Sequence, residues 1–249
     1  PHPLTLWLKL DSGMGRLGLL PASLPLLYQS LKSKPWLGQV ILMTHLASSS
    51  EPDAALNAYQ LARFTAVQDT LEPVPSSTSI EASAGLLASL AHTGFARPGI
   101  MLYGSSPFAF EDTSRRREAF GLQAVMTLRA RLLSIKEYQA GDNIGYNSQF
   151  VCPHPMRIGI VSCGYADGYP SNTPNGCPVL VEDIRCSTVG RVSMDMMAID
   201  LTACPQARAD MLVTLWGATL SVDEIAHHTG ILSYNLTCSV ANRVSRQYV

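Results

Sequence analysis

The sequence has almost no excess of charge of either sign. Its 249 residues carry 18 lysines and arginines against 19 aspartates and glutamates, which gives a formal net charge of -1. Nucleic acids and anionic membranes attract proteins with an excess of positive charge, so this balance predicts neither kind of partner. The short run Arg115-Arg116-Arg117 is typical of a solvated surface segment.

Long apolar runs are also missing. No stretch approaches the roughly 20 apolar residues that a membrane-spanning helix needs, and the first residues have neither the basic nor the apolar region of a signal peptide. These absences predict a cytoplasmic protein that is neither secreted nor inserted in a membrane.

Metal-binding patterns are absent as well. The six cysteines form no C-x-x-C pair, and no nearby histidine completes a zinc spacing. We therefore expect no metal and reduced thiols that lie mostly in the core. The chain starts at Pro1 without a methionine and runs straight into a strand-like segment, so we expect it to be a piece of a longer polypeptide.

What the sequence does contain is a sizeable apolar fraction, 47% of its residues. In the first hundred residues short apolar runs alternate with helical patterns, which predicts parallel strands joined by helical crossovers. The expected strands are residues 4–10, 39–44, 78–80 and 100–103, and the expected helices are residues 22–33, 57–71 and 84–91.

The pattern changes near residue 119, where apolar runs begin to be separated by turn residues, and this predicts an all-β domain. The Pro-, Ser- and charge-rich stretch before it suits an exposed linker. We therefore expect two domains, residues 1–118 (α/β) and 119–249 (β-rich). Ser221 and Glu224 have the spacing of a capping box and Gly230 suits a helix C-terminus, so one late helix is expected.

The segment Gly13-Met14-Gly15-Arg16-Leu17-Gly18 matches the dinucleotide-binding pattern G-x-G-x-x-G. That pattern needs a helix to begin at the glycines and an acidic residue about 20 positions later. Pro21 and Pro25 delay the helix, and no acidic residue occurs between Asp11 and Glu51. The glycines therefore predict a tight turn, and a dinucleotide site is disfavoured.

Polar residues gather instead where the expected strands end. Alternation along the first strand turns Lys9 away from the leucine face, and the next loop supplies Asp11 and Arg16. These three residues form either a ligand site or a structural ion-pair group, and the first strand alone does not separate the two readings. His45 follows the second strand at the same face, and it is either a site residue or a hydrogen-bonded core histidine.

Ser83 follows the third expected strand and precedes a helix, so it is either a phosphate ligand or a helix N-cap. Its hydroxyl, with the N–H groups of Gly99 and Ile100, would suit a phosphate, and Arg97 would suit a heterocyclic nitrogen. Taken together, these strand ends favour a ligand site.

Six segments in order, "LKLDSGMGRLG", "MTHLA", "RPGIMLYG", "GYADGYP", "VGRVSMDMMAIDL" and "VANRVSRQYV", closely resemble the bacterial alanine racemases. The resemblance covers nearly the whole chain. It implies the second half of a (β/α)8 TIM barrel that binds pyridoxal 5'-phosphate (PLP), followed by a C-terminal β domain. It also implies a head-to-tail homodimer that racemises alanine and supplies D-alanine for peptidoglycan.

The resemblance also assigns residues one by one. Lys9 would be a carbamylated lysine that holds Arg16 for the substrate carboxylate and the cofactor's phenolic oxygen. The cofactor ligands would be His45 against the ring, Arg97 at the ring nitrogen, and Ser83, Gly99, Ile100 and Tyr234 at the phosphate. Tyr146 would be a catalytic base, and Tyr165, Met194 and Asp195 would line the substrate end, with Tyr146, Tyr165 and Met194 acting on the partner subunit's site.

The sequence departs from the family in two respects. The lysine that forms the Schiff base, in a motif such as A-x-V-K-A-N-A-Y-G-H-G, is not among the four lysines Lys9, Lys32, Lys34 and Lys136. In addition, Asn147 and Gln149 replace the usual residues after the catalytic tyrosine. The sequence thus leaves three hypotheses: part of an alanine racemase, part of a racemase for serine or another small amino acid, or a non-catalytic dimerisation module.

Overall fold

The computed structural model describes residues 2–92 and 94–248. The chain divides into two compact units. Unit 1 runs to Leu102 and includes Ser106–Phe120, whereas unit 2 comprises Tyr103–Ser105 and the chain from Gly121 onward. Each unit buries its own cluster of apolar side chains.

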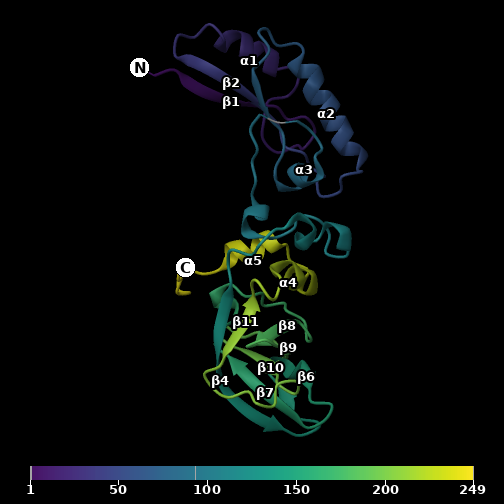
Figure 1. Cartoon of the computed structure of the whole chain (residues 1–249), viewed down its shortest axis with the longest axis vertical. Coiled ribbons are helices and arrows are strands. Elements are labelled where there is room, and N and C mark those ends of the chain that lie inside the picture. Colours follow the sequence, from purple (N-terminus) through teal and green to yellow (C-terminus); the bar gives the residue numbers. More distant parts are fainter. Residues whose placement is uncertain (1, 93, 249) are drawn as a thin grey trace. The chain divides into compact units, whose positions relative to one another are not determined.

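Unit 1 is built on a three-stranded parallel sheet in the order β1-β2-β3, with helices in the connections (Figure 1). Its elements are β1 (Leu4–Lys9), α1 (Leu24–Leu31), β2 (Leu37–Met43), α2 (Ala55–Gln68), β3 (Ser77–Ser79) and α3 (Ser83–Ala88). The predicted alternation of strands and helices is confirmed over this part. Parallel neighbours require such crossovers, because the chain must return to the same end of the sheet before it pairs again.

Side chains alternate across β1 as the sequence predicts. Leu8 and Leu10 are buried in the core of unit 1, whereas Trp7, which precedes Leu8, is 42% exposed. Lys9 shares the face of Trp7 because successive strand residues point to opposite sides. The segments that follow β1, β2 and β3 all leave the same end of the sheet, since the three strands are parallel, and this end collects the polar residues described below.

The expected fourth strand is wrong: residues Ile100–Tyr103 form a 3-10 helix. The Leu102 N–H donates to Gly99 O at 2.9 Å, and the Met101 N–H donates to Ser83 Oγ at 3.3 Å. Both N–H groups are therefore already hydrogen-bonded, one to the adjoining Gly99 and one to a hydroxyl. They are not available to pair with a neighbouring strand. Its apolar composition alone could not distinguish the two conformations.

Unit 2 contains a closed antiparallel barrel with the strand order β10-β7-β4-β11-β8-β9 (Figure 1). Its elements are β4 (Leu128–Tyr138), β5 (Asn143–Ile144), β6 (Phe150–Val151), β7 (Met156–Val161), β8 (Pro178–Val181), β9 (Ile184–Val189), β10 (Met197–Asp200), β11 (Leu212–Trp216), α4 (Val222–Thr229) and α5 (Ser233–Ser239). The β-rich character expected from the sequence is confirmed, and closure leaves the six strands without an open edge.

The barrel interior is apolar. Tyr169 stacks on Trp216 with ring centroids 5.9 Å apart, and both rings are buried. All six cysteines are free and five are buried, as expected for reduced core thiols. Burial raises the pKa of the Cys163 thiol to about 12 and that of Cys177 to about 11, so both stay protonated near neutral pH.

The predicted late helix is α4. Ser221 Oγ accepts a hydrogen bond from Asp223 N–H at 3.0 Å, and Gly230 ends the helix in the left-handed conformation. The carboxylate of Glu224, expected to complete the cap, pairs with Arg185 of β9. The sequence analysis did not anticipate α5, because its seven residues are too few to show a helical period.

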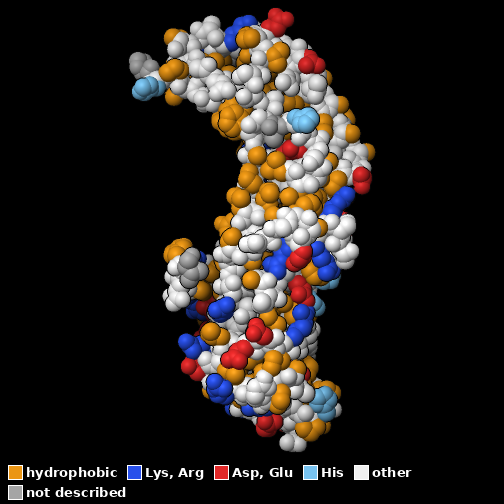
Figure 2. All heavy atoms as spheres, viewed as in Figure 1, with side chains coloured by type: hydrophobic (Ala, Val, Ile, Leu, Met, Phe, Trp, Pro, Cys, Tyr) orange, Lys and Arg blue, Asp and Glu red, His pale blue; other side chains and the backbone are white. Residues whose placement is uncertain are grey.

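The surface agrees with the balanced composition. Figure 2 shows basic and acidic side chains interspersed over the visible face of unit 2, with no extended field of one sign. Within residues 2–92 and 94–248, no helix is long and apolar enough to cross a membrane.

Candidate active site

A closed loop of residues 10–19 follows β1 and carries Arg16. Two backbone hydrogen bonds close its base: Asp11 N–H donates to Leu19 O at 2.9 Å, and Leu19 N–H donates to Lys9 O at 2.8 Å. Lys9 is therefore fixed at the base of the loop, while Arg16 lies on its exposed part.

The Asp11 carboxylate organises this loop from inside. Its Oδ1 accepts hydrogen bonds from the N–H groups of Gly13, Met14 and Gly15, each at 3.0 Å. These donors, with Gly15 first and Gly13 second, lower the pKa of Asp11. The carboxylate consequently stays ionised at neutral pH and holds the turn.

The glycines of the loop serve the turn, as predicted. Gly13, Gly15 and Gly18 all have positive φ. A Cβ at Gly18 would lie 2.7 Å from Asp11 N and 2.9 Å from Leu10 C, so that position has no room for a side chain. No helix begins until Leu24, which agrees with the argument against a dinucleotide site.

His45 follows β2 and contacts Arg97. Arg97 Nη2 lies 3.4 Å from His45 Nδ1 and donates to it, because a guanidinium has no acceptor. Burial, followed by the positive charges of Arg97, Arg16 and Lys9, lowers the pKa of His45. The structure thus brings His45 and Arg97 into contact, and the positive charges of Arg16 and Lys9 also disfavour protonation of the imidazole.

The Arg97 guanidinium is held by the strand ends as well. Nη1 donates to Ser79 Oγ at 2.5 Å, and Nη2 donates to Thr44 O at 2.7 Å and Ile80 O at 3.1 Å. Sequence reasoning missed Ser79 and Thr44, although a buried hydroxyl at the end of a parallel strand is a signal for such a role.

Ser83 and Gly99 are in contact beside this group. The Ser83 hydroxyl is buried and accepts from the Gly99 N–H at 2.8 Å. The two segments run side by side because Arg97 N–H donates to Glu81 O at 3.1 Å. Ser83, Gly99 and Ile100 consequently belong to one small region of unit 1, at the start of α3 and the following 3-10 helix.

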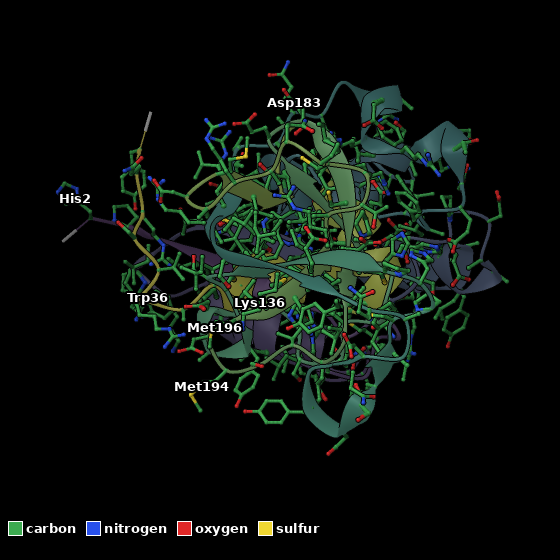
Figure 3. The ribbon with its side chains drawn as sticks, turned by 90° about the horizontal axis from the view of Figure 1, so that it is seen from below. His2, Trp36, Lys136, Asp183, Met194 and Met196 are labelled. Atoms are coloured by element: carbon green, nitrogen blue, oxygen red, sulfur yellow. The ribbon has the colours of Figure 1, made fainter. Side chains whose placement is uncertain are left out.

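In unit 2, Tyr165 and Met194 lie on two segments that pair with each other. Tyr165 N–H donates to Ser193 O at 3.0 Å, and Ala166 N–H donates to Met194 O at 2.8 Å. Met194 is 57% exposed and projects from the molecule (Figure 3). Asp195 follows it directly, so Tyr165, Met194 and Asp195 share one region.

Tyr146 is 66% exposed and begins a short 3-10 segment, Tyr146–Ser148. Asn147 has φ of 56°, a left-handed conformation that asparagine tolerates better than most residues. The turn after the tyrosine therefore suits an asparagine at position 147. Gln149 joins the loop through its carbonyl, which accepts from Asn175 Nδ2 at 3.4 Å.

Tyr234 lies in the first turn of α5. Its side chain is partly exposed, and burial of the remaining part of the side chain raises the pKa of its phenol. The hydroxyl stays protonated at neutral pH and can donate a hydrogen bond.

Asp167 is a further residue of the Tyr165 loop that sequence reasoning did not single out. Its Oδ1 accepts from Arg243 Nε at 2.7 Å, and its Oδ2 accepts from Gly164 N–H at 2.9 Å. Its carbonyl accepts from Ala241 N–H at 3.0 Å. Asp167 thereby ties the C-terminal segment to the loop that carries Tyr165.

The residues of unit 1 fit PLP chemically. A phosphate requires N–H and O–H donors, and the Ser83 hydroxyl, which accepts from Gly99 N–H and Met101 N–H, has a proton of its own to donate. The ring requires a donor or counter-charge at its nitrogen and a flat neighbour, for which Arg97 and the neutral His45 are suited.

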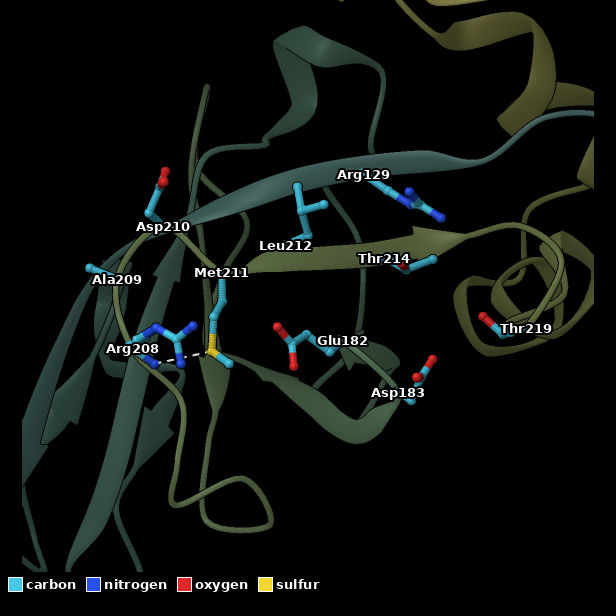
Figure 4. Close-up of a pocket in the computed structure, with 10 residues that line it drawn as sticks. All are labelled: Arg129, Glu182, Asp183, Arg208, Ala209, Asp210, Met211, Leu212, Thr214 and Thr219. Carbon is cyan, nitrogen blue, oxygen red and sulfur yellow. Dashed lines mark hydrogen bonds between the residues drawn. The ribbon is translucent and has the colours of Figure 1, made fainter. Parts of the chain in front are cut away.

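One cavity of about 550 Å³ lies elsewhere, on the outside of the barrel between β4, β11 and the turn joining β8 to β9 (Figure 4). It is lined by charges of both signs, among them Arg129, Arg208 and Glu182. None of the site residues predicted from the sequence lines it.

Comparisons with known proteins identify the family of this chain. Residues 1–107 match the family profile "Alanine racemase, N-terminal domain", and residues 125–248 match "Alanine racemase, C-terminal domain". An alanine racemase of Pseudomonas taetrolens is 44% identical over 99% of this chain and 67% of its own length. The biosynthetic alanine racemase of Pseudomonas aeruginosa is 45% identical over 99% of this chain and 67% of its own length.

Solved structures give the same result. The crystal structure of biosynthetic alanine racemase from Pseudomonas aeruginosa superposes with a TM-score of 0.93 at 44% identity, over 100% of this chain and 68% of that one. The structure of alanine racemase from Acinetobacter baumannii superposes with a TM-score of 0.89 at 36% identity, over 98% of this chain and 66% of that one. This chain thus spans about two thirds of the length of these relatives. It belongs to the alanine racemase family.

Proposed function

We propose that this chain is the larger part of an alanine racemase, an isomerase that interconverts L- and D-alanine with PLP. The observation that carries the proposal is the contact between Arg97 and the neutral His45, beside the donors of Ser83. When bound, PLP supplies an electron sink for the carbanion that forms as the α-proton leaves.

In this proposal the cofactor would be held by the residues that the family resemblance assigns to it. Arg97 would bind the ring nitrogen and His45 would lie against the ring. Ser83, Gly99, Ile100 and Tyr234 bind the phosphate, with Tyr234 as a neutral donor. The positive charge of Arg97 at the ring nitrogen would disfavour protonation of that nitrogen.

Arg16 binds the substrate carboxylate, and a carbamate on Lys9 holds Arg16. The charge distribution supports this assignment: among the described residues, none of the ion pairs involves Lys9 or Arg16. Both contribute to the positive surroundings that lower the pKa of His45. An anionic group on Lys9 would neutralise part of this charge and give the guanidinium a partner.

Tyr146 is the proposed base on one face of the substrate. A racemase needs a second base on the opposite face. The other lysines do not suit this role: Lys34 and Lys136 are exposed, and Lys32 Nζ donates to Glu72 O at 3.0 Å on the surface. We propose that the second base, a lysine that binds the cofactor covalently, belongs to the third of the family's length that this chain does not span.

The same third would complete a (β/α)8 barrel, to which the three parallel strands of unit 1 contribute. We further propose a domain boundary near residue 118 and a homodimer, in which Tyr146, Tyr165 and Met194 act on the partner subunit's site together with Asp195. Exposure of Tyr146 and Met194 supports an arrangement in which a second subunit covers them.

The test is made on the protein with its complete natural sequence. After incubation with PLP and borohydride reduction, denaturing mass spectrometry should find one pyridoxyl group on a lysine other than Lys9, Lys32, Lys34 or Lys136. Chiral chromatography should show L- and D-alanine interconverting, and Tyr146→Phe should abolish this conversion while leaving the pyridoxyl adduct. Absence of both adduct and racemisation would overturn the proposal.

A second candidate, a non-catalytic dimerisation module, is favoured by one observation, the absence of the Schiff-base motif among the four lysines. It predicts no adduct but a dimer in light scattering. A racemase for serine or another small amino acid predicts the adduct together with a higher kcat/KM for that substrate than for alanine.

The physiological direction requires a separate test. This chain is 45% identical to a biosynthetic relative and 44% identical to a catabolic alanine racemase of Pseudomonas putida, so identity does not separate the two roles. We propose a supply of D-alanine for peptidoglycan. Growth of a D-alanine auxotroph that expresses the complete protein would support this role, and failure to grow despite racemase activity in the extract would count against it.

A further inference from the structure

Gln60 lies on α2, outside the residues assigned to the substrate or cofactor, and it is completely buried. Its amide links two segments of the candidate active site. Oε1 accepts from Ala47 N–H at 2.8 Å, whereas Nε2 donates to His45 O at 3.1 Å and to Ser12 Oγ at 3.3 Å. Ala47 and His45 belong to the segment after β2, and Ser12 belongs to the loop of residues 10–19.

The hydrogen bonds continue beyond Ser12 in one direction. Thr44 Oγ1 donates to Leu10 O at 2.9 Å, so its proton is used. Ser12 Oγ, at 2.8 Å from Thr44 Oγ1, is consequently the donor in that pair and the acceptor from Gln60. The order is Gln60 to Ser12 to Thr44 to Leu10, and buried chains with a single sense reinforce each bond.

This chain of hydrogen bonds reaches the residues of the site at both ends. Thr44 O accepts from Arg97 Nη2, and Leu10 begins the loop that carries Arg16. The loop also rests on Gln60 directly, because a Cβ at Gly13 would lie only 3.2 Å from Gln60 Cγ. Gln60, Ser12 and Thr44 have exposed fractions of 0%, 0% and 1%, so no water can replace a missing partner without rearrangement.

We propose that Gln60 is a positioning residue of the active site, whose amide fixes the Arg16 loop relative to the segment that carries His45. The inference rests on the proposed function only for the roles of Arg16 and His45; the geometry stands without it. An apolar residue of similar size would fill the space but would leave the Ala47 N–H and the His45 carbonyl without these bonds.

The same helix offers a matched control. Asn57, one turn before Gln60, is also buried, and its Nδ2 donates to Ser48 O, Glu51 O and Pro52 O at 3.2, 2.9 and 3.2 Å. It fixes the later part of the segment that follows β2, and its amide bonds to neither Ser12 nor His45. Gln60→Met and Asn57→Leu therefore remove comparable buried amides, only one of which reaches the site.

The experiment uses the complete protein, labelled with ¹⁵N and free of cofactor, and measures amide hydrogen exchange. Gln60→Met should speed exchange at Ala47 and at Gly13 to Gly15 by about tenfold or more. The imidazole of His45 should titrate at a pKa closer to its ordinary value, because a loosened segment admits water. Asn57→Leu should change neither readout, even where it lowers the unfolding midpoint equally.

Gln60→Glu separates the bond that Gln60 accepts from Ala47 from the bonds that it donates to His45 and Ser12. It also replaces Gln60→Met as the test variant if Gln60→Met does not fold. A carboxylate still accepts from Ala47 N–H but donates to neither His45 O nor Ser12 Oγ. Ala47 should then keep its protection while Gly13 to Gly15 lose theirs. If both Gln60 variants behave as Asn57→Leu does, Gln60 is only a structural residue and the inference fails.

Binding of pyridoxine 5'-phosphate, which cannot react with a lysine, distinguishes this inference from the proposed function. The unaltered protein should bind it, and Gln60→Met should weaken binding by about tenfold. If the unaltered protein does not bind it, the proposed cofactor site is wrong, whereas the exchange and imidazole readouts still decide the role of Gln60.

Discussion

Arg97 donates a hydrogen bond from Nη2 to Nδ1 of His45 across 3.4 Å, and this contact fixes the protonation state of the histidine. The guanidinium can only donate, so Nδ1 must carry a lone pair and the proton must be on Nε2. The lowered pKa of His45, caused by burial and then by the charge of Arg97, gives the same state. A neutral imidazole thus adds no further positive charge beside Arg97.

The first prediction concerns pH. The fold favours neutral His45, so as pH falls below the ordinary value of about 6.5 the unfolded chain takes up this proton first and the native state loses stability. The loss continues until the lowered native pKa is reached. We expect His45→Gln to remove the contribution of this histidine to the dependence of unfolding free energy on pH. That contribution is about 1.4 kcal/mol for each pH unit between the pKa of His45 in the unfolded chain and its pKa in the native state.

Urea unfolding at about pH 7.5 and about pH 5.5 measures this slope. His154→Gln, a change of an exposed histidine, is the control for the loss of an imidazole elsewhere in the chain. Identical pH dependence in His45→Gln and the unaltered protein would contradict the prediction.

The second prediction is that Arg97→Lys destabilises unit 1 by about 2 kcal/mol. A single ammonium cannot reach Ser79 Oγ, Thr44 O and Ile80 O together with His45 Nδ1, so buried acceptors lose their partners. Chemical unfolding monitored by circular dichroism gives the value. Arg63→Lys, on the exposed side of α2, should stay within about 0.5 kcal/mol, and an equally small effect at Arg97 would refute the argument.

The third prediction compares two glycines of the Arg16 loop. Gly18→Ala places a Cβ against the backbone of Asp11 and Leu10, and we expect a loss on the order of 3 kcal/mol. Gly15→Ala meets nothing within 4 Å and carries only the conformational cost of its positive φ, about 1 kcal/mol. Thermal unfolding of both variants shows which substitution destabilises the protein more. A larger loss for Gly15→Ala would show that Gly18 is not required by its close contact with the base of the loop.

The fourth prediction concerns the loop of Tyr165. Asp167→Ala removes an acceptor for both Gly164 N–H and Arg243 Nε, so the loop and the C-terminal segment should separate and kcat/KM should fall about tenfold. Arg243→Ala leaves the bond to Gly164 intact and should have a smaller effect that fades at high salt. Steady-state racemisation by the complete protein is the measurement. Equal effects of the two substitutions would mean that the ion pair alone positions the loop.

The sequence predicted the alternation of unit 1 and the strands of unit 2 because both are periodic. In β1, the leucines at alternate positions identify the buried face of the strand. Lys9 lies between two leucines of this pattern, so it is on the opposite face. Residues 100–103 were misread because four apolar residues have no period, and the decision was made by Ser83, distant in sequence, which accepts from Met101 N–H. The helix α5 was not predicted because its seven residues are also too few to show a period.

The order of motifs in the sequence was sufficient to identify the family and the basic residues Lys9, Arg16, His45 and Arg97, since each follows a strand or lies in a turn with its own local pattern. The sequence also placed Gly13 to Gly18 in a turn, because no helix could begin there. Local spacing, however, carries no information on which buried polar groups meet.

Only the tertiary structure decided that Gln60 bonds to both Ser12 and His45 O, that Arg97 is held by Ser79 and Thr44, and that Asp167 ties Arg243 to the Tyr165 loop. These partners lie far apart in the chain, and they meet because parallel strands end together and because buried donors and acceptors must find one another.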